Sequence, residues 1–161
     1  MLQIYYTIIY SFLTYSVLAW GNSYVTNIKS LIILQKRAVR IITFSDYRAH
    51  ASPLFKTLNL LKFPDIVKLY TGTFMLQYSK DLLPVDFNNF FTEIKNVHQH
   101  NTLLASRKIT YTLPLPRTNY GIFNIIFFGP KIWNPLEDSL KSLNTKSFKK
   151  KLKSQLSHQY E

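Results

Sequence analysis

The segment 25–43 constrains the fold most, because its apolar residues recur at every third or fourth position and predict an amphipathic helix. At about 100° per residue, one broad arc of this helix carries the apolar residues Leu31, Leu34, Ala38, Val39, Ile41 and Ile42. The cations Lys29, Lys36 and Arg40 fall on the opposite side, flanked by Arg37. Such a helix can bury one side and present a line of cations, although basic stripes also face solvent on many ordinary helices.

Residues 1–28 have a different character, since they contain no Asp, Glu, Lys or Arg. The run Ile4–Trp20 is mostly apolar, but a membrane-spanning helix needs about 20 strongly apolar residues. This run is interrupted by the hydroxyl residues Thr7, Ser11, Thr14 and Ser16. No cation precedes it, as a secretory signal would require. We therefore predict a buried helix over Leu2–Trp20, ended by Gly21 and Asn22, and no membrane partner.

The helical spacing continues through Leu54–Met75, where it predicts core helices, with Pro64 in a first turn. The predicted fold class is mainly α with a small β-hairpin. Its divisions are a helical region over 1–80 that includes the basic helix 25–43, a connecting loop over 81–107, a β-hairpin over 108–128, and a C-terminal region over 129–161 that carries a lysine-rich helix.

The hairpin prediction comes from alternation. Ile109, Tyr111 and Leu113 alternate with threonines, a turn follows at Asn119–Gly121, and a second apolar run comes after it. Tyr111 and Tyr120 on this hairpin would either stack on nucleic-acid bases or pack on the core. We favour packing, because a buried or half-buried tyrosine is the more ordinary case.

The C-terminal block holds the strongest local charge of the chain. Asn134 and Pro135 suit the N-cap and the first turn of a short helix. In the terminal helix that follows, the apolar stripe is formed by Phe148, Leu152 and Leu156, four residues apart. Six lysines lie from Lys141 to Lys153 with no acid among them.

The overall charge points to a polyanionic partner. Lys plus Arg number 20 against 8 Asp plus Glu, which gives a net charge of +12 and a pI near 9.9. Nucleic acid is the commonest partner of so basic a chain, an anionic membrane surface is the second, and a merely solvated surface is the third possibility. We expect nuclear or cytoplasmic localisation. The chain has no cysteine, which excludes disulfides and thiolate zinc sites.

The sequence predicts no catalytic centre, cofactor or metal. The 8 acids are scattered and include no adjacent aspartate pair, whereas two-metal nucleotidyl transfer needs convergent carboxylates. His98 and His100 share a spacing that can hold a metal, but a bare pair is a weak signal and favours loop histidines. The glycines are isolated, so no phosphate-binding loop is present.

The order of several phrases resembles the carboxy-terminal region of the reverse transcriptases encoded by non-LTR (LINE) retrotransposons of the jockey type. The phrases are Leu13-Thr14-Tyr15, Ala19-Trp20-Gly21-Asn22, Leu34-Gln35-Lys36-Arg37-Ala38-Val39-Arg40-Ile41-Ile42, Tyr47-Arg48-Ala49-His50, Pro53-Leu54-Phe55, Leu82-Leu83-Pro84, His100-Asn101-Thr102, Pro116-Arg117-Thr118-Asn119, Gly129-Pro130-Lys131-Ile132-Trp133-Asn134 and Phe148-Lys149-Lys150-Lys151-Leu152. Together they span nearly the whole chain. The chain departs from the family where Ser16 replaces a glycine, where Leu103 replaces an arginine, and where Pro135-Leu136 directly follows Asn134.

The resemblance implies a piece of an RNA-directed DNA polymerase that lies downstream of the palm, thumb-like or beyond it, without the catalytic aspartates, in a truncated copy. It implies no enzyme activity in isolation, and RNA or DNA backbone and the upstream polymerase core as partners. The candidate nucleic-acid contacts are Lys29, Lys36, Arg37, Arg40, Arg117, Lys149, Lys150, Lys151 and Lys153.

Two alternatives remain open at this point. In the first, the chain is an orphaned structural fragment or interaction module whose uncharged first helix packed on the missing polymerase. In the second, that helix anchors the chain at a membrane surface.

Overall fold

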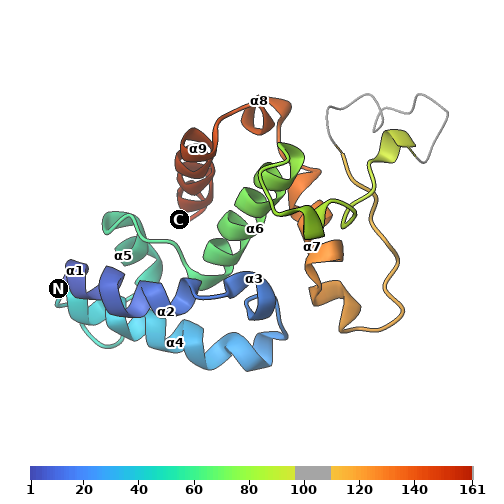
Figure 1. Cartoon of the computed structure of the whole chain (residues 1–161). Coiled ribbons are helices and arrows are strands. Elements are labelled where there is room, and N and C mark those ends of the chain that lie inside the picture. Colours follow the sequence, from blue (N-terminus) through green and yellow to red (C-terminus); the bar gives the residue numbers. More distant parts are fainter. Residues whose placement is uncertain (97–109, 161) are drawn as a thin grey trace. The chain divides into compact units, whose positions relative to one another are not determined.

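The computed structural model describes residues 1–96 and 110–160, and in these ranges the chain is mainly helical, with neither a strand nor a sheet (Figure 1). The elements are α1 (Leu2–Ile4), the π-helical η1 (Tyr5–Tyr10), α2 (Ser11–Thr14), α3 (Val17–Trp20), α4 (Val25–Ile42), α5 (Ala51–Thr57), α6 (Phe63–Ser79), the short 3₁₀ turns η2 (Val85–Phe87), η3 (Ile94–Asn96) and η4 (Gly121–Phe123), α7 (Ile125–Trp133), α8 (Asp138–Lys141) and α9 (Thr145–His158). They form two compact units, Met1–Val67 with Leu152–Glu161, and Lys68–Lys151.

In the first unit, the uncharged N-terminal segment is helical but broken. The helix predicted over Leu2–Trp20 is interrupted after α2, because Ser16 adopts the left-handed conformation with φ 46°. Such a φ disfavours a side chain and suits glycine. The prediction that this helix is buried is wrong for most of its length, since only Tyr5, Leu13 and Val17 are buried in it. Within the part of the chain that the structure describes, none of the helices combines the length and the apolar character needed to cross a membrane.

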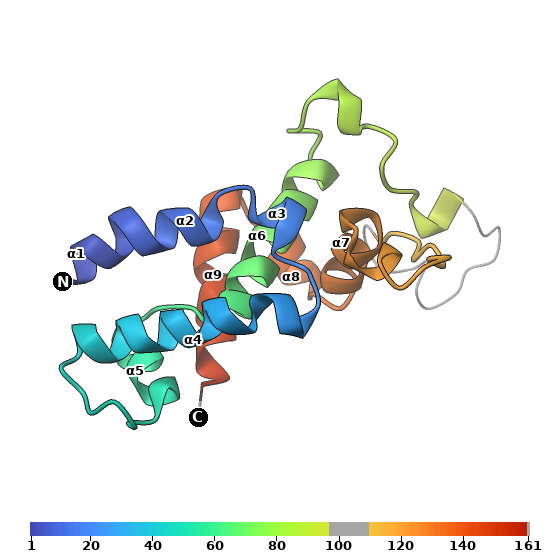
Figure 2. The same ribbon diagram turned by 90° about the horizontal axis from the view of Figure 1, so that it is seen from below.

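Helix α4 runs antiparallel to this N-terminal segment (Figures 1 and 2), and a buried amide ties the two together. The Gln35 side chain is 2% exposed. Its Nε2 donates to the Tyr5 hydroxyl at 3.0 Å and to the Leu61 carbonyl oxygen at 2.9 Å, while its Oε1 accepts from Phe63 N–H at 2.9 Å. A buried polar side chain is tolerated only when its hydrogen bonds are made, so Gln35 fixes the position of three backbone and side-chain groups.

The buried face of α4 is rotated from the predicted arc. Val39 is fully buried as predicted, but Leu34 is 59% exposed and Ile41 is 63% exposed. The polar Gln35 takes the buried place that the apolar pattern assigned to these residues. The prediction that Leu34 and Ile41 are core residues is therefore wrong.

The first unit is completed from the C-terminal end of the chain. The Tyr160 hydroxyl donates to Asp65 Oδ2 at 2.6 Å and accepts from Lys62 N–H at 2.9 Å, and Lys62 Nζ lies 4.2 Å from the centre of the Tyr160 ring. Burial, reinforced by the hydrogen bond to Asp65, raises the pKa of Tyr160 above its ordinary value. The hydroxyl therefore remains protonated and serves as a permanent donor to the buried carboxylate of Asp65.

The core of the second unit is aromatic. Tyr78 meets Phe91 and Tyr111 edge-to-face, with ring centroids 4.7 Å and 5.5 Å apart. Trp133 is fully buried, and its ring centroid lies 6.2 Å from that of Phe148. The interpretation of Tyr111 as a core residue is confirmed, since its side chain is 2% exposed.

The predicted β-hairpin over 108–128 is wrong. Of this region the structure describes 110–128, where the only ladder contact is an isolated bridge between Tyr111 and Glu93. The second apolar run opens helix α7 instead, and Asn124 caps it by accepting from Ile126 N–H at 3.0 Å. A short continuous apolar run does not by itself distinguish a strand from a buried helix, and the side-chain cap decides for the helix.

The prediction for Asn134 is also wrong. Asn134 is the C-cap of α7 rather than an N-cap, and helix α8 begins only at Asp138. Its side-chain amide clamps the backbone of Tyr111 from both sides, with Oδ1 accepting from Tyr111 N–H at 3.0 Å and Nδ2 donating to the Tyr111 carbonyl oxygen at 2.8 Å. A single side chain therefore makes the two backbone hydrogen bonds with Tyr111 that a neighbouring strand would make in a β-sheet.

Candidate nucleic-acid interface

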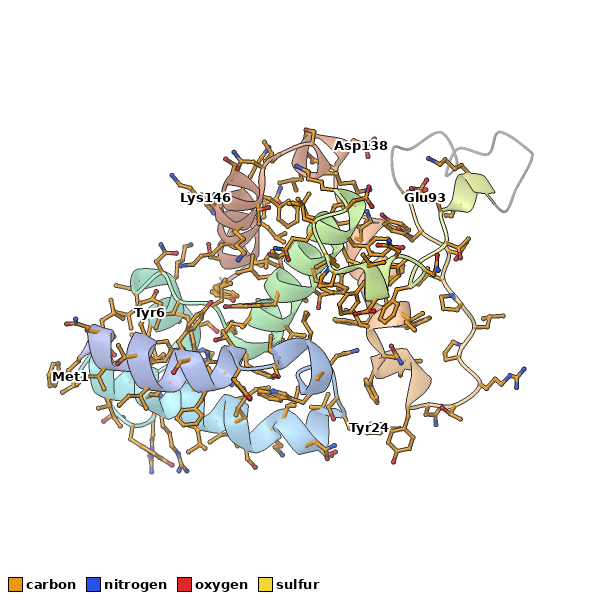
Figure 3. The ribbon with its side chains drawn as sticks, viewed as in Figure 1. Met1, Tyr6, Tyr24, Glu93, Asp138 and Lys146 are labelled. Carbon is orange, nitrogen blue, oxygen red and sulfur yellow. The ribbon has the colours of Figure 1, made fainter. Side chains whose placement is uncertain are left out.

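Helix α9 presents lysines on its surface beside a buried apolar stripe. Phe148, Leu152 and Leu156 are buried, as predicted. The side chains of Lys146, Lys149, Lys150 and Lys151 are exposed, and Figure 3 labels Lys146 on this helix. Residues three or four apart share a helix face, so Lys146, Lys149 and Lys150 lie on one flank and Lys151 on the other. We call Lys146, Lys149 and Lys150 the α9 lysine row.

Two other lysines of the basic stretch 141–153, Lys141 and Lys153, are less accessible to a ligand than the α9 lysine row. Lys153 is half-buried, and this burial lowers the pKa of its ammonium group. Lys141 is 3% exposed, with Nζ 3.7 Å from Asp138 Oδ1 and 5.6 Å from the centre of the Trp133 ring. The ammonium of Lys141 is therefore part of the packing of the second unit rather than of its surface charge.

The other predicted contacts are divided between the two units. Lys29, Lys36 and Arg37 are exposed on α4, whereas Arg40 is half-buried and its Nε donates to the Ala49 carbonyl oxygen at 2.8 Å. These four belong to the first unit with Lys153, and Arg117, which is exposed, belongs to the second with Lys149, Lys150 and Lys151. Within the first unit the cations 29–40 share helix α4, and within the second Lys149, Lys150 and Lys151 share helix α9.

The C-terminal end of α4 carries a feature that the sequence analysis missed. A hollow of about 660 Å³ is lined by Arg37, Arg40, Ile41, Phe44, Ser45 and Tyr47. The side chain of Phe44 is 83% exposed and that of Tyr47 is 70% exposed. Two arginines therefore share one hollow with two solvent-facing aromatic rings. The sequence contains one signal for this hollow, since the aromatic residues Phe44 and Tyr47 follow directly after the basic helix. Both lie outside the segment whose helical periodicity supported the prediction.

An apolar groove adjoins this hollow. The N-terminal segment contributes Ile8, Ile9, Phe12 and Leu13 to it, and α4 contributes Leu31, Leu34, Gln35, Arg37, Ala38 and Ile41. Its volume is about 470 Å³, and Phe12 at its edge is 75% exposed. Contiguous exposed apolar surface of this kind is typical of sites that meet another molecule.

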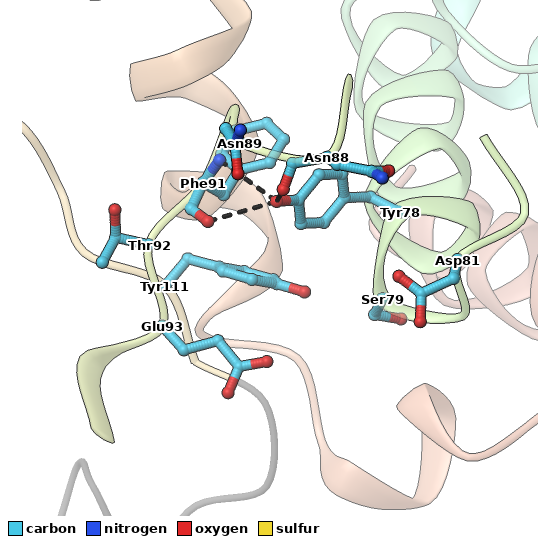
Figure 4. Close-up of a pocket in the computed structure, with 9 residues that line it drawn as sticks. All are labelled: Tyr78, Ser79, Asp81, Asn88, Asn89, Phe91, Thr92, Glu93 and Tyr111. Carbon is cyan, nitrogen blue, oxygen red and sulfur yellow. Dashed lines mark hydrogen bonds between the residues drawn. The ribbon is translucent and has the colours of Figure 1, made fainter. Parts of the chain in front are cut away.

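The second unit contains a polar hollow of about 450 Å³ (Figure 4). The rings of Tyr78 and Tyr111 and the carboxylates of Asp81 and Glu93 surround it. The Tyr78 hydroxyl donates to the Asn88 carbonyl oxygen at 3.0 Å, and the buried Oε2 of Glu93 lies 2.5 Å from Lys95 Nζ. Burial, with a smaller contribution from the charge of Glu93, raises the pKa of Tyr111. The Tyr78 hydroxyl, which also contacts the backbone of Phe91, thus holds the loop 88–93 against α6.

Among residues 1–96 and 110–160 there is no group of three or more His, Asp or Glu side chains that could hold a metal ion. His98 and His100 lie outside these described residues. Tyr120, the other tyrosine considered for base stacking, is 75% exposed. Comparisons with protein-family models, with curated proteins and with solved structures gave no match.

Proposed function

We propose that this chain is a non-catalytic, nucleic-acid-binding part of a retrotransposon RNA-directed DNA polymerase, from the region downstream of the palm and in a truncated copy. The observation that carries the proposal is the α9 lysine row, whose exposed cations lie in a stretch, 139–160, that has no acidic residue. The likeness of sequence phrases to the family of non-LTR reverse transcriptases supports the same proposal.

The chemistry of the row favours contacts with phosphates over contacts with base edges. Lysine ammonium groups are compact point charges on flexible stems, without the planar fork that reads a base edge bidentately. Each phosphate that they neutralise releases condensed counterions, so binding is tight at low salt and falls steeply as salt rises. The expected activity is therefore sequence-independent attachment to RNA or DNA.

Replacing the three lysines of the α9 lysine row with glutamine is expected to weaken binding to duplex DNA about tenfold at low salt. It should also lower the slope of log affinity against log salt by about 2 to 3, since each lost phosphate contact contributes about 0.9. Fluorescence anisotropy with a labelled duplex at several salt concentrations measures both quantities.

A control of equal net charge separates a localised interface from general attraction. The control replaces three exposed lysines outside the proposed interface, Lys56, Lys80 and Lys131, with glutamine. The control variant should bind nearly as well as the unmodified chain. Equal loss in both triple variants, or no binding by the unmodified chain even at low salt, would contradict the proposal.

The apolar groove favours a second candidate function, an interaction module whose N-terminal segment packs on another protein surface. Its support is the exposure of Phe12 (75%), Leu34 (59%) and Ile8 (54%) around one groove. An uncovered groove of this kind promotes self-association of the isolated chain. A monomer that unfolds cooperatively would argue against this candidate, and sedimentation velocity distinguishes the two outcomes.

A further inference from the structure

Helix α4 ends in a turn that ordinarily selects glycine. Phe44 N–H donates to the Ile41 carbonyl oxygen at 3.2 Å, and Ser45 N–H donates to the Arg40 carbonyl oxygen at 3.0 Å. This bond pair is that of a Schellman motif, in which the residue after the C-cap adopts the left-handed conformation. Phe44 holds that place with φ 53°. A bulky side chain is unfavourable there, and glycine is not.

Burial of the ring does not compensate for this strain. The Phe44 side chain is 83% exposed, so it gains little from the hydrophobic effect. A strained residue with its apolar ring in solvent indicates a use for the ring outside the fold. The turn holds the ring beside the hollow that Arg37, Arg40 and Tyr47 also line.

The electrostatics of the hollow favour an anion. Arg37 and Arg40 line it, and the Nε bond of Arg40 to Ala49 holds that guanidinium in place. Asp46 is the one carboxylate between residues 37 and 48, and its Oδ1 accepts from Arg48 N–H at 2.8 Å. It is not among the residues that line the hollow, and three arginines in the same stretch outweigh its charge.

We propose that this hollow binds a base of single-stranded nucleic acid, which stacks on Phe44 and Tyr47 while Arg37 and Arg40 hold the adjacent phosphates. Aromatic rings beside a cationic groove are the usual means of holding single strands without reading their sequence. A duplex cannot use such rings, because its base faces are covered by their neighbours. This inference rests on the proposed function and narrows it to single strands at one site.

The decisive variant is Phe44→Gly, because it separates the fold from the function. Glycine suits the left-handed position, so the urea midpoint should stay the same or rise. The affinity for a labelled oligouridylate should nevertheless fall about fivefold or more, since one stacking partner is lost. Affinity for a DNA duplex and for polyglutamate should not change, because neither offers an accessible base to the ring.

Tyr15→Ala is the matched control and should leave the oligouridylate affinity unchanged, since Tyr15 is also exposed in the first unit (77%) but does not line this hollow. Tyr47→Leu should lower the oligouridylate affinity in the same direction as Phe44→Gly. Unchanged oligouridylate affinity in Phe44→Gly overturns the inference while leaving the proposed function intact, provided that the α9 lysine row still matters. An equal loss of polyglutamate affinity overturns it in favour of an acidic peptide as ligand. Failure of the unmodified chain to bind duplex and single strand alike removes the proposed function itself.

Discussion

Replacing Gln35 with leucine is expected to lower the free energy of unfolding of the first unit by about 4 kcal/mol. Leucine has a similar size, so the change removes hydrogen bonds rather than volume. It leaves the Leu61 carbonyl oxygen, Phe63 N–H and the Tyr5 hydroxyl without the partner that Gln35 provides. Each buried group left without a partner costs about 1 to 3 kcal/mol, and the estimate follows from their sum.

Tyr5→Phe is the matched control for this prediction. It removes only the hydroxyl end of the network and should cost about 1 kcal/mol. Urea unfolding followed by circular dichroism at neutral pH gives both free energies. If Gln35→Leu proved no more destabilising than Tyr5→Phe, the two backbone hydrogen bonds of Gln35 would have no energetic importance.

Replacing Trp133 with alanine should destabilise the second unit by about 4 kcal/mol, in the range for a large aromatic residue removed from a core. Trp133 has no exposed side-chain surface and packs near the ring of Phe148. The substitution also removes the ring beside which the buried ammonium of Lys141 lies. An unshielded buried cation adds to the cost of the cavity.

Trp20→Ala provides the comparison, because it removes the same side chain from a less buried place. Trp20 is 37% exposed and stacks on Phe63 with ring centroids 5.3 Å apart. We expect this variant to lose about 2 kcal/mol. Thermal unfolding of the two variants ranks them directly, and an equal loss of stability would refute the central place of Trp133 in the core.

The sequence predicted the bounds of long, periodic helices well, but it did not predict which face of the helix is buried. Helix α4 spans Val25–Ile42, close to the predicted 25–43. The pattern could not reveal that Gln35 is buried, because its partners Leu61 and Phe63 come 26 and 28 residues later in the chain. The exposure of Leu34 and Ile41 has the same cause. When Gln35 is buried, the helix is rotated so that these two side chains face the apolar groove.

The prediction of a β-hairpin was wrong for a related reason, because the contacts that decide between strand and helix are not visible in the apolar pattern. The run at 122–128 is apolar except for Asn124, and the side-chain cap made by this residue shows that a helix starts there. The alternation around Tyr111 reflects a real extended segment, but its pairing is made by the Asn134 side chain and by a single bridge to Glu93. Extended residues held by side chains do not differ in sequence from residues held in a sheet.

The candidate interface was partly predictable. A run of lysines next to an apolar stripe can be recognised in the sequence itself. The exposure of Lys149, Lys150 and Lys151 then follows from the helical period. The burial of Lys141 depends on Trp133 and Asp138 and is not visible there. Phe44 was not predicted as a site residue, because what distinguishes it is its left-handed backbone conformation, with φ 53°. A phenylalanine in the sequence gives no indication of that conformation.

The first unit is discontinuous in the sequence, and this sets the order in which its two segments can come together during synthesis. Met1–Val67 is synthesised before Leu152–Glu161, so Asp65 and the Lys62 backbone receive the Tyr160 hydroxyl only after the whole of Lys68–Lys151 has been made. During that interval Phe55 lacks the ring of Tyr160, against which it packs edge-to-face with ring centroids 6.4 Å apart. Late closure of this kind slows folding and lengthens the exposure of aggregation-prone surface. A nascent chain stalled before residue 160 would therefore be a stronger client for chaperones than a chain that includes Tyr160.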